Sequence, residues 1–177
     1  MSEHLNIGLP EQISIKNNYD SIEITRQWPR FQPFTMALGA VYLIYHCVTK
    51  YTGTENVDIP NLLYLLVFII LMTYFSLAGL LNKTYIMVTK KNVEIRHRPI
   101  PWVGNKIIDA SEIKQLYAKE RRIKNNRLKY EVHVITHSGE DTKLLRLLDS
   151  SKQALYIEQE VEKYLSIKNV SVHEELG

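Results

Sequence analysis

Residues 60–81 read PNLLYLLVFIILMTYFSLAGLL and contain no charged side chain across twenty-two positions. A hydrocarbon core about 30 Å thick is crossed by about 20 apolar residues in a helix. A helix that is apolar on every side has no face to present to water, and the residues that follow have few continuous apolar runs with which to bury one. The stretch therefore predicts a membrane-spanning helix over residues 61–81.

A second, weaker apolar run precedes it. Residues 31–48, FQPFTMALGAVYLIYHCV, carry no formal charge at neutral pH, although they reach only the lower limit of spanning length. Residues 49–61, TKYTGTENVDIPN, contain the turn residues glycine, asparagine and proline and are too short to form a domain. We expect a helical hairpin over residues 31–81, and a buried helix of a soluble protein remains the alternative for the first segment.

The basic residues near this hairpin lie on its terminal sides. Those before it are Lys16, Arg26 and Arg30, and those after it are Lys83, Lys90, Lys91, Arg96 and Arg98. Since lysine and arginine concentrate in cytoplasmic segments, both termini are expected in the cytoplasm. The prediction is a multi-pass protein of the cell inner (plasma) membrane.

The flanks have the alternation of β-strands. In residues 11–28, isoleucines alternate with polar residues on both sides of an Asn17-Asn18 turn, which predicts a β-hairpin within residues 1–30. Residues 82–166 continue with further alternating segments separated by Pro, Gly and Asn turns. We interpret the N-terminal hairpin as the first two strands of the same domain, interrupted by the membrane insertion.

The last element changes to a helical period. Ser150 and Gln153 fit a capping box, and apolar residues then recur at helical spacing, so residues 151–166 predict an amphipathic helix. Residues 167–177 are expected to form a flexible tail. The domain of residues 82–166 is thus expected to consist of antiparallel strands followed by one C-terminal helix, and the expected overall class is an α+β membrane protein.

This outline resembles a known family. The stretches YIMVTKKNVEIRHRPIPWVGNKIIDASEIKQLYAKE and THSGEDTKLLRLLDSSKQALYIEQEVEKYL are similar to bacterial membrane-anchored pleckstrin-homology-like (PH-like) proteins. The likeness covers residues 82–166 and rests on structural motifs: a Tyr-x-hydrophobic-x-Thr strand, an Ile-x-x-Ser-Glu-Ile step, a late Ser-Gly turn and a final helix. It implies a PH-like barrel joined to a transmembrane pair, and the N-terminal β-hairpin departs from it.

Charge is unevenly distributed, although the formal net charge is only +3. Residues 83–129 hold thirteen Lys and Arg against four acids, whereas residues 130–177 hold five against nine. The strongest concentration is KERRIKNNRLK, residues 119–129, around an Asn125-Asn126 turn. A hairpin tip of this kind on a tethered domain can contact anionic lipid head groups or a partner. The candidate contact residues are Lys119, Arg121, Arg122, Lys124, Arg127 and Lys129.

Catalytic and cofactor motifs are not evident. The sequence contains no Gly-rich phosphate loop, Walker-type sequence or zinc motif, so we expect no enzyme activity, no catalytic residue and no cofactor. His133 and His137 have the spacing of one strand face, but no third ligand accompanies them and no metal site is predicted. The one cysteine, Cys47, excludes an intramolecular disulfide.

Two functional hypotheses follow. The first is a non-catalytic, membrane-anchored binding or scaffold protein that presents its cytoplasmic domain to anionic lipid or a protein partner. The alternative is an accessory or assembly subunit of a larger membrane complex, in which small residues allow close helix packing; these are Gly39, Ala40, Ser76 and Gly79. Nucleic acid is disfavoured because no aromatic series accompanies the basic residues, and the oligomeric state is left open.

Overall fold

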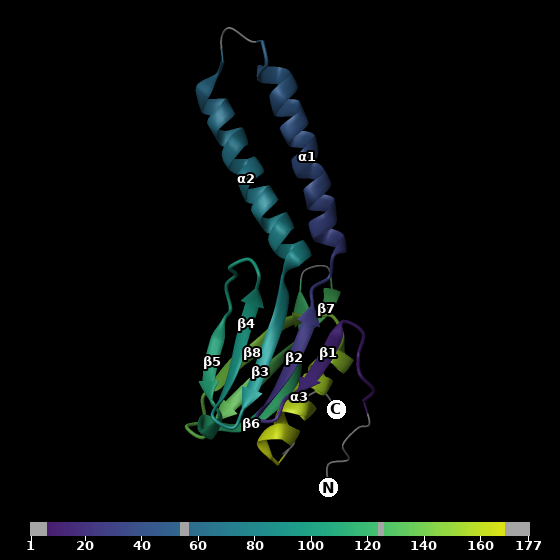
Figure 1. Ribbon diagram of the computed structural model, residues 1–177, viewed down its shortest axis with the longest axis vertical. Coiled ribbons are helices and arrows are strands. Elements are labelled where there is room, and N and C mark those ends of the chain that lie inside the picture. The colour runs from purple at the N-terminus through teal and green to yellow at the C-terminus, as the bar shows by residue number, and fades with distance from the viewer. Residues whose placement is uncertain (1–6, 54–56, 124–125, 169–177) are drawn as a thin grey trace. The chain divides into compact units, whose positions relative to one another are not determined.

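The computed structural model describes residues 7–53, 57–123 and 126–168 (Figure 1). It is an α+β structure with two antiparallel sheets and two long apolar helices. The described residues form two compact units. The first unit draws on residues 7–26, 84–96, 104–123 and 126–168, and the second on residues 27–53, 57–83 and 97–103.

The first sheet has five strands in the order β1-β2-β3-β4-β5. In β1 and β2, Ile15 lies opposite Ile24, so the alternating isoleucines share one face of the sheet. β2 is the sheet neighbour of β3, although residues 28–82 separate them along the chain. The strands are β1 (Ile13–Asn17), β2 (Ser21–Gln27), β3 (Lys83–Thr89), β4 (Asn92–Arg98) and β5 (Lys106–Asp109).

The second sheet has three strands in the order β6-β7-β8. They are β6 (Ile113–Ile123), β7 (Arg127–Thr136) and β8 (Asp141–Leu148), and the short 3-10 helix η1 (Ala110–Glu112) leads into β6. The expected closed barrel is wrong, because the described strands form two separate ladders.

Side chains join the strands where a barrel would need backbone pairing. Lys106 of β5 donates from Nζ to the Lys143 carbonyl of β8 at 2.7 Å. Arg26 of β2 donates from Nη2 to the Leu147 carbonyl, also at 2.7 Å. These side chains take up carbonyl groups of β8 that a further paired strand would otherwise satisfy.

The C-terminal helix α3 (Ser151–Leu165) packs on the three-stranded sheet. Ser150 caps it by accepting from the Gln153 backbone N–H at 3.3 Å, which agrees with the predicted helix start. On the free edge of β6, the Leu116 N–H donates to the Glu162 carboxylate at 3.2 Å. The helix therefore both covers the core and satisfies an exposed strand edge.

A single apolar core joins both sheets and α3. It includes Ile24, Ile86, Val88, Val93, Ile95, Leu116, Val132, Val134, Ala154, Ile157 and Val161, all of which are 0–1% exposed.

Residues 1–6 of the predicted N-terminal segment and residues 169–177 of the predicted tail lie outside the described residues.

The second unit is dominated by α1 (Phe31–Tyr51) and α2 (Ile59–Leu81), which run side by side (Figure 1). Both are long and apolar enough to cross a membrane. They exceed the predicted spans of 31–48 and 61–81 by a few residues. The earlier start of α2 has a physical reason, since the Asp58 carboxylate caps the Asn61 backbone N–H at 3.3 Å and Pro60 lies in the first turn.

Small residues allow α1 and α2 to approach each other. A Cβ atom added at Gly79 of α2 would lie 2.3 Å from Cγ of Pro33 in α1. A Cβ atom added at Gly39 of α1 would lie 3.2 Å from Cε of Met72 in α2, which is the end of a flexible side chain. A methyl group at position 39 could therefore be accommodated by a small movement of Met72, whereas one at position 79 would require the Pro33 ring to move.

We predict that Gly79→Ala destabilises the helix pair, because the rigid Pro33 ring has to move away. Overpacking of this kind costs about 1–3 kcal/mol, which exceeds the gain of about 1 kcal/mol from the higher helix propensity of alanine. The free energy of unfolding of the full chain in detergent micelles, measured by circular dichroism, checks this.

Gly39→Ala is the matched control, since the Met72 methyl group can rotate aside, and its stability should stay near that of the wild type. Equal stability of the two variants would contradict the proposed contact between Gly79 and Pro33.

Candidate functional site

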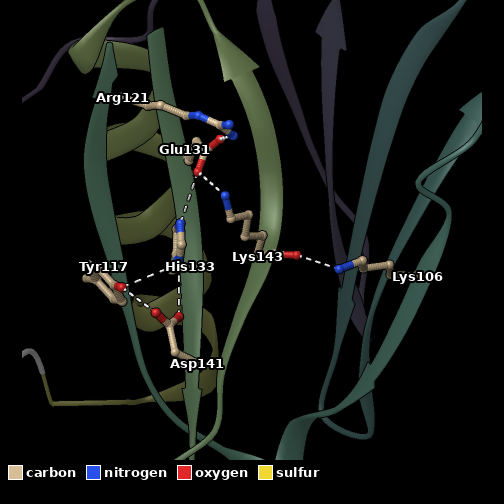
Figure 2. Close-up of polar contacts among 7 residues, drawn as sticks. All are labelled: Lys106, Tyr117, Arg121, Glu131, His133, Asp141 and Lys143. Atoms are coloured by element: carbon tan, nitrogen blue, oxygen red, sulfur yellow. Dashed lines mark hydrogen bonds and ion pairs between the residues drawn. The ribbon is translucent and has the colours of Figure 1, made fainter. Parts of the chain in front are cut away.

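A cluster of polar side chains occupies one face of the three-stranded sheet (Figure 2). Tyr117 of β6, His133 of β7 and Lys143 of β8 lie in one row, because His133 is the register partner of both others. Alternate residues of a strand point to opposite faces, and the neighbouring Val132 and Val134 belong to the apolar core. The cluster therefore lies on the face away from that core.

Glu131 is the centre of the cluster (Figure 2). Arg121 Nη1 contacts its Oε1 atom at 2.8 Å, and Lys143 Nζ contacts its Oε2 atom at 3.0 Å. His133 Nε2 lies 3.3 Å from the same Oε2 atom. Each carboxylate oxygen of Glu131 is thus in contact with at least one basic side chain. Hydrogen bonds between oppositely charged groups are stronger than those between neutral groups.

Exposure is divided unequally between Glu131 and its partners. The Glu131 side chain is 3% exposed, whereas the side chains of Arg121 and Lys143 are 52% and 37% exposed. The carboxylate is therefore covered while the two cations remain partly in water. This arrangement leaves the cations able to contact a further anion.

The basic partners lower the pKa of Glu131 from 4.5 to about 2. Burial on its own would raise this pKa, but hydrogen bonds from Arg121, Lys143 and His133 outweigh that effect. The change corresponds to at most about 3 kcal/mol of folding stability. Water around the exposed cations reduces the contribution to about 1–2 kcal/mol.

A second carboxylate lies at the other side of His133. His133 Nδ1 lies 2.9 Å from Asp141 Oδ1, and the Tyr117 hydroxyl donates to Asp141 Oδ2 at 2.8 Å. Burial on its own would raise the pKa of Asp141. The hydrogen bonds from His133 and Tyr117 lower this pKa by more than burial raises it, so the net shift is downward. A neutral imidazole donates to only one of the two carboxylates, whereas an imidazolium donates to both.

This arrangement is poorly suited to acid–base catalysis. A general base works best when its pKa is close to the working pH, yet the pKa values of Glu131 and Asp141 are both lowered. Within the described ranges, no group of three His, Cys, Asp or Glu residues has the geometry of a metal site. The cluster acts chemically as a fixed, hydrogen-bonded layer of charge.

His133 and His137 do not share a strand face, as their spacing had suggested. β7 ends at Thr136, and His137 lies in the following turn, where its backbone N–H donates to the Glu112 carbonyl at 2.9 Å. His133 contacts Glu131 and Asp141 instead. The spacing rule assumed a strand longer than the one that forms.

Five of the six predicted contact residues lie within the described ranges of the β6–β7 hairpin. Four of them share one face by strand register, and Arg122 lies on the other; the four are Lys119, Arg121, Arg127 and Lys129. Arg121 is the register partner of Lys129, and Arg122 is the partner of Leu128. Adjacent residues of a strand point to opposite faces, so Arg121 and Arg122 diverge. Most of the described basic residues therefore share the face that carries Glu131, and Arg122 points away from it.

Several of these cations already have carboxylate neighbours. Arg121 binds Glu131, Lys129 forms an ion pair with Asp149, and Arg122 lies 3.9 Å from Glu120. Lys119 is half-buried and contributes to the low pKa of Asp141. Arg127 is exposed, and Lys124 lies outside the described residues.

Sequence reasoning missed Glu131, Asp141, Lys143 and Tyr117 as members of one cluster. The available signal was the alternation in β7, where Glu131 and His133 occupy the positions between the apolar residues and so share the opposite face. Their partners come from β6 and β8, and only the strand register identifies them.

Comparison with known proteins does not assign the chain to a family. No family model matches it, and no curated protein shows significant sequence similarity to it.

We predict that Glu131→Gln reduces stability at neutral pH by about 1–2 kcal/mol and flattens the acid dependence of stability. The folded-state pKa of Glu131 lies below 4.5, so its contribution is complete above about pH 4.5 and is lost as pH falls towards 2. Urea unfolding of the full chain in a non-ionic detergent, measured from pH 7 to pH 2, checks this.

Asp20→Asn is the matched control, because Asp20 is an exposed carboxylate in the turn between β1 and β2. Its pH profile should follow that of the wild type. A Glu131→Gln profile that also follows the wild type would show that the cluster does not stabilise the fold.

Proposed function

We propose that this protein is a non-catalytic membrane-anchored binding or scaffold protein. In this proposal α1 and α2 cross the inner (plasma) membrane as a hairpin, and the β-rich unit lies in the cytoplasm. That unit presents basic residues to anionic lipid head groups or to a protein partner. The observation that carries the proposal is the pair of long, apolar helices inserted between two neighbouring strands of a folded sheet.

The surface of the helices supports membrane insertion. Their outward side chains are large and apolar, and many are about half exposed or more, which is costly in water. They include Leu38, Val41, Tyr45, Leu63, Val67, Phe68 and Ile70. A bilayer covers such a surface without any requirement for a protein partner.

The small residues favour an anchor over an assembly subunit. Gly39 and Gly79 face side chains of the partner helix within the α1–α2 pair, and Ala40 and Ser76 are buried. Close approach of another helix uses small residues, and these positions are already occupied. The alternative role in a larger membrane complex would therefore depend on the larger outward side chains.

The charge cluster supports binding. Arg121 and Lys143 are bound to Glu131 from one side, while their partly exposed ends remain in contact with water. Together with the exposed Arg127, they give one face of the β6–β7 hairpin and its neighbour β8 a basic surface. The exposed Arg122 adds a positive charge on the opposite face. A basic residue near an anionic bilayer contributes about 1 kcal/mol.

We also propose a distant relationship to PH-like domains. The support is the succession of antiparallel strands that ends in one helix packed on the sheet, and the unclosed pair of sheets is a departure from that family. A shared architecture does not specify a ligand.

The topology leads to a testable prediction. In a Cys47→Ala background, Thr52→Cys at the end of α1 should react in intact cells with a maleimide that does not cross membranes. Tyr19→Cys, in the turn between β1 and β2, should react only after the cells are opened. Labelling of Tyr19→Cys in intact cells would contradict cytoplasmic termini, and equal labelling of both before opening would contradict a spanning hairpin.

Lipid binding is tested by vesicle flotation of a variant in which a flexible linker replaces residues 31–81. We expect flotation with anionic but not neutral vesicles, and its loss at high salt because salt screens exposed charges. Arg122→Glu with Arg127→Glu should abolish flotation. Arg121 is left intact because its reversal would expose the buried Glu131 charge.

Lys114→Glu with Lys152→Glu is the control, since both lysines are exposed and the net charge changes equally. Circular dichroism verifies that every variant is folded. A folded variant that fails to float with anionic vesicles would shift the proposal to a protein partner.

A further inference from the structure

The connection between β4 and β5 contacts the membrane helix α2. The first part of this connection, residues 99–103, PIPWV, is called the proline loop below. All of its contacts described here lie within the second unit. The Trp102 ring stacks on Tyr74 of α2 at 6.4 Å and meets Phe75 edge to face at 5.8 Å. Trp28, just before α1, packs against the Trp102 ring at 5.4 Å.

Hydrogen bonds hold the backbone of the proline loop to the same helix. Asn82, directly after α2, accepts from the Ile100 N–H at 2.8 Å and donates to the Ile100 carbonyl at 2.9 Å. The Tyr74 hydroxyl donates to the Pro101 carbonyl at 2.6 Å. Pro99 and Pro101 have no N–H to satisfy. Irregular backbone is tolerated at membrane depth where protein groups satisfy it in this way.

The contact with Tyr74 places the loop along α2 and not merely at its end. Tyr74 precedes the last residue, Leu81, by seven positions, and a rise of 1.5 Å per residue makes this about 10 Å. A helix of this length slightly exceeds a hydrocarbon core about 30 Å thick. Tyr74 therefore lies in the outer part of the acyl-chain layer, within the depth of about 5–10 Å that interfacial elements reach.

The outer side of the proline loop is apolar. Val103 is 83% exposed, Pro99 and Pro101 are also exposed, and Trp102 is half-buried. Tryptophan and tyrosine are enriched at the membrane interface, where their rings have one apolar and one polar side. Arg98, which precedes the loop, is exposed and basic, as expected for a residue beside anionic head groups.

We propose that the proline loop is a third membrane-contacting element, inserted into the interfacial layer of the bilayer beside α2. The partner of the loop is lipid, because the loop adds its exposed apolar side chains to the uncharged surface of α2. Hydrogen bonds from Tyr74 and Asn82 hold the loop to this helix. The loop gives the chain a shallow lipid contact in addition to the two helices. This inference rests on the proposed function, since it requires that α2 cross the membrane.

The test uses the full chain, reconstituted in lipid nanodiscs and carrying single spin-labelled cysteines in a Cys47→Ala background. Paramagnetic resonance compares collisions of each label with oxygen, which partitions into lipid, and with a water-soluble nickel chelate. Val103→Cys reports on the proline loop. Val67→Cys, on the exposed surface of α2, is the lipid reference, and Tyr19→Cys, 101% exposed in a turn of the β-rich unit, is the water reference.

We expect the label at residue 103 to collide several-fold more with oxygen than with the nickel chelate, as the label at residue 67 does, and unlike the label at residue 19. If residue 103 resembles residue 19 while residue 67 remains in lipid, the inference is overturned and the membrane hairpin stands. If residue 67 is itself accessible to the chelate, both the hairpin and the inference fail.

An independent measurement uses the native tryptophan. The chain contains two tryptophans, so Trp28→Phe leaves Trp102 as the only indole fluorophore. Lipids brominated near the head group should quench Trp102 more strongly than lipids brominated near the chain ends. Absence of quenching by either lipid would overturn the insertion of the loop.

Discussion

The pairing of β2 with β3 is the constraint on which the arrangement of the chain depends. These strands are neighbours in one sheet, yet residues 28–82 lie between them. The inserted segment must therefore leave one strand and return to the next. Two antiparallel helices joined by a short connection meet this requirement, whereas a single long helix would end far from the strand that it has to rejoin. The sheet thus selects a helical hairpin, and the glycines let the two helices approach each other.

The β-rich unit is joined across its sheets by side chains. Arg26 and Lys106 donate to carbonyls of β8, and Glu162 accepts from an N–H of β6. These bonds occupy edge groups, and α3 covers the core that a closed barrel would enclose. The opposite face of the three-stranded sheet is then free to carry charge. There the row formed by Tyr117, His133 and Lys143 brings both carboxylates of the cluster within reach of their donors.

The spacing of apolar and polar residues in the sequence predicted much of the fold. The uncharged run predicted α2, the alternating isoleucines predicted β1 and β2, and the capping serine marked the start of α3. The barrel was not predicted correctly, because closure depends on which edge groups find side-chain partners. The basic contact residues of the hairpin stay a prediction, and the sequence did not show that Arg122 lies on the opposite face from Arg121 and Lys129. The partners of Glu131 come from three strands, and no local pattern specifies their register.

The sequence by itself determined the apolar helices, the strand-forming flanks and the amphipathic C-terminal helix, because each depends on the local spacing of apolar and polar residues. Only the tertiary structure decided that the chain forms two open sheets, that Glu131 is held by Arg121, Lys143 and His133, and that the proline loop lies along α2. These features depend on contacts between residues far apart in sequence. Such contacts are set by strand register and by hydrogen bonds to individual backbone groups, neither of which leaves a periodic signal in the sequence.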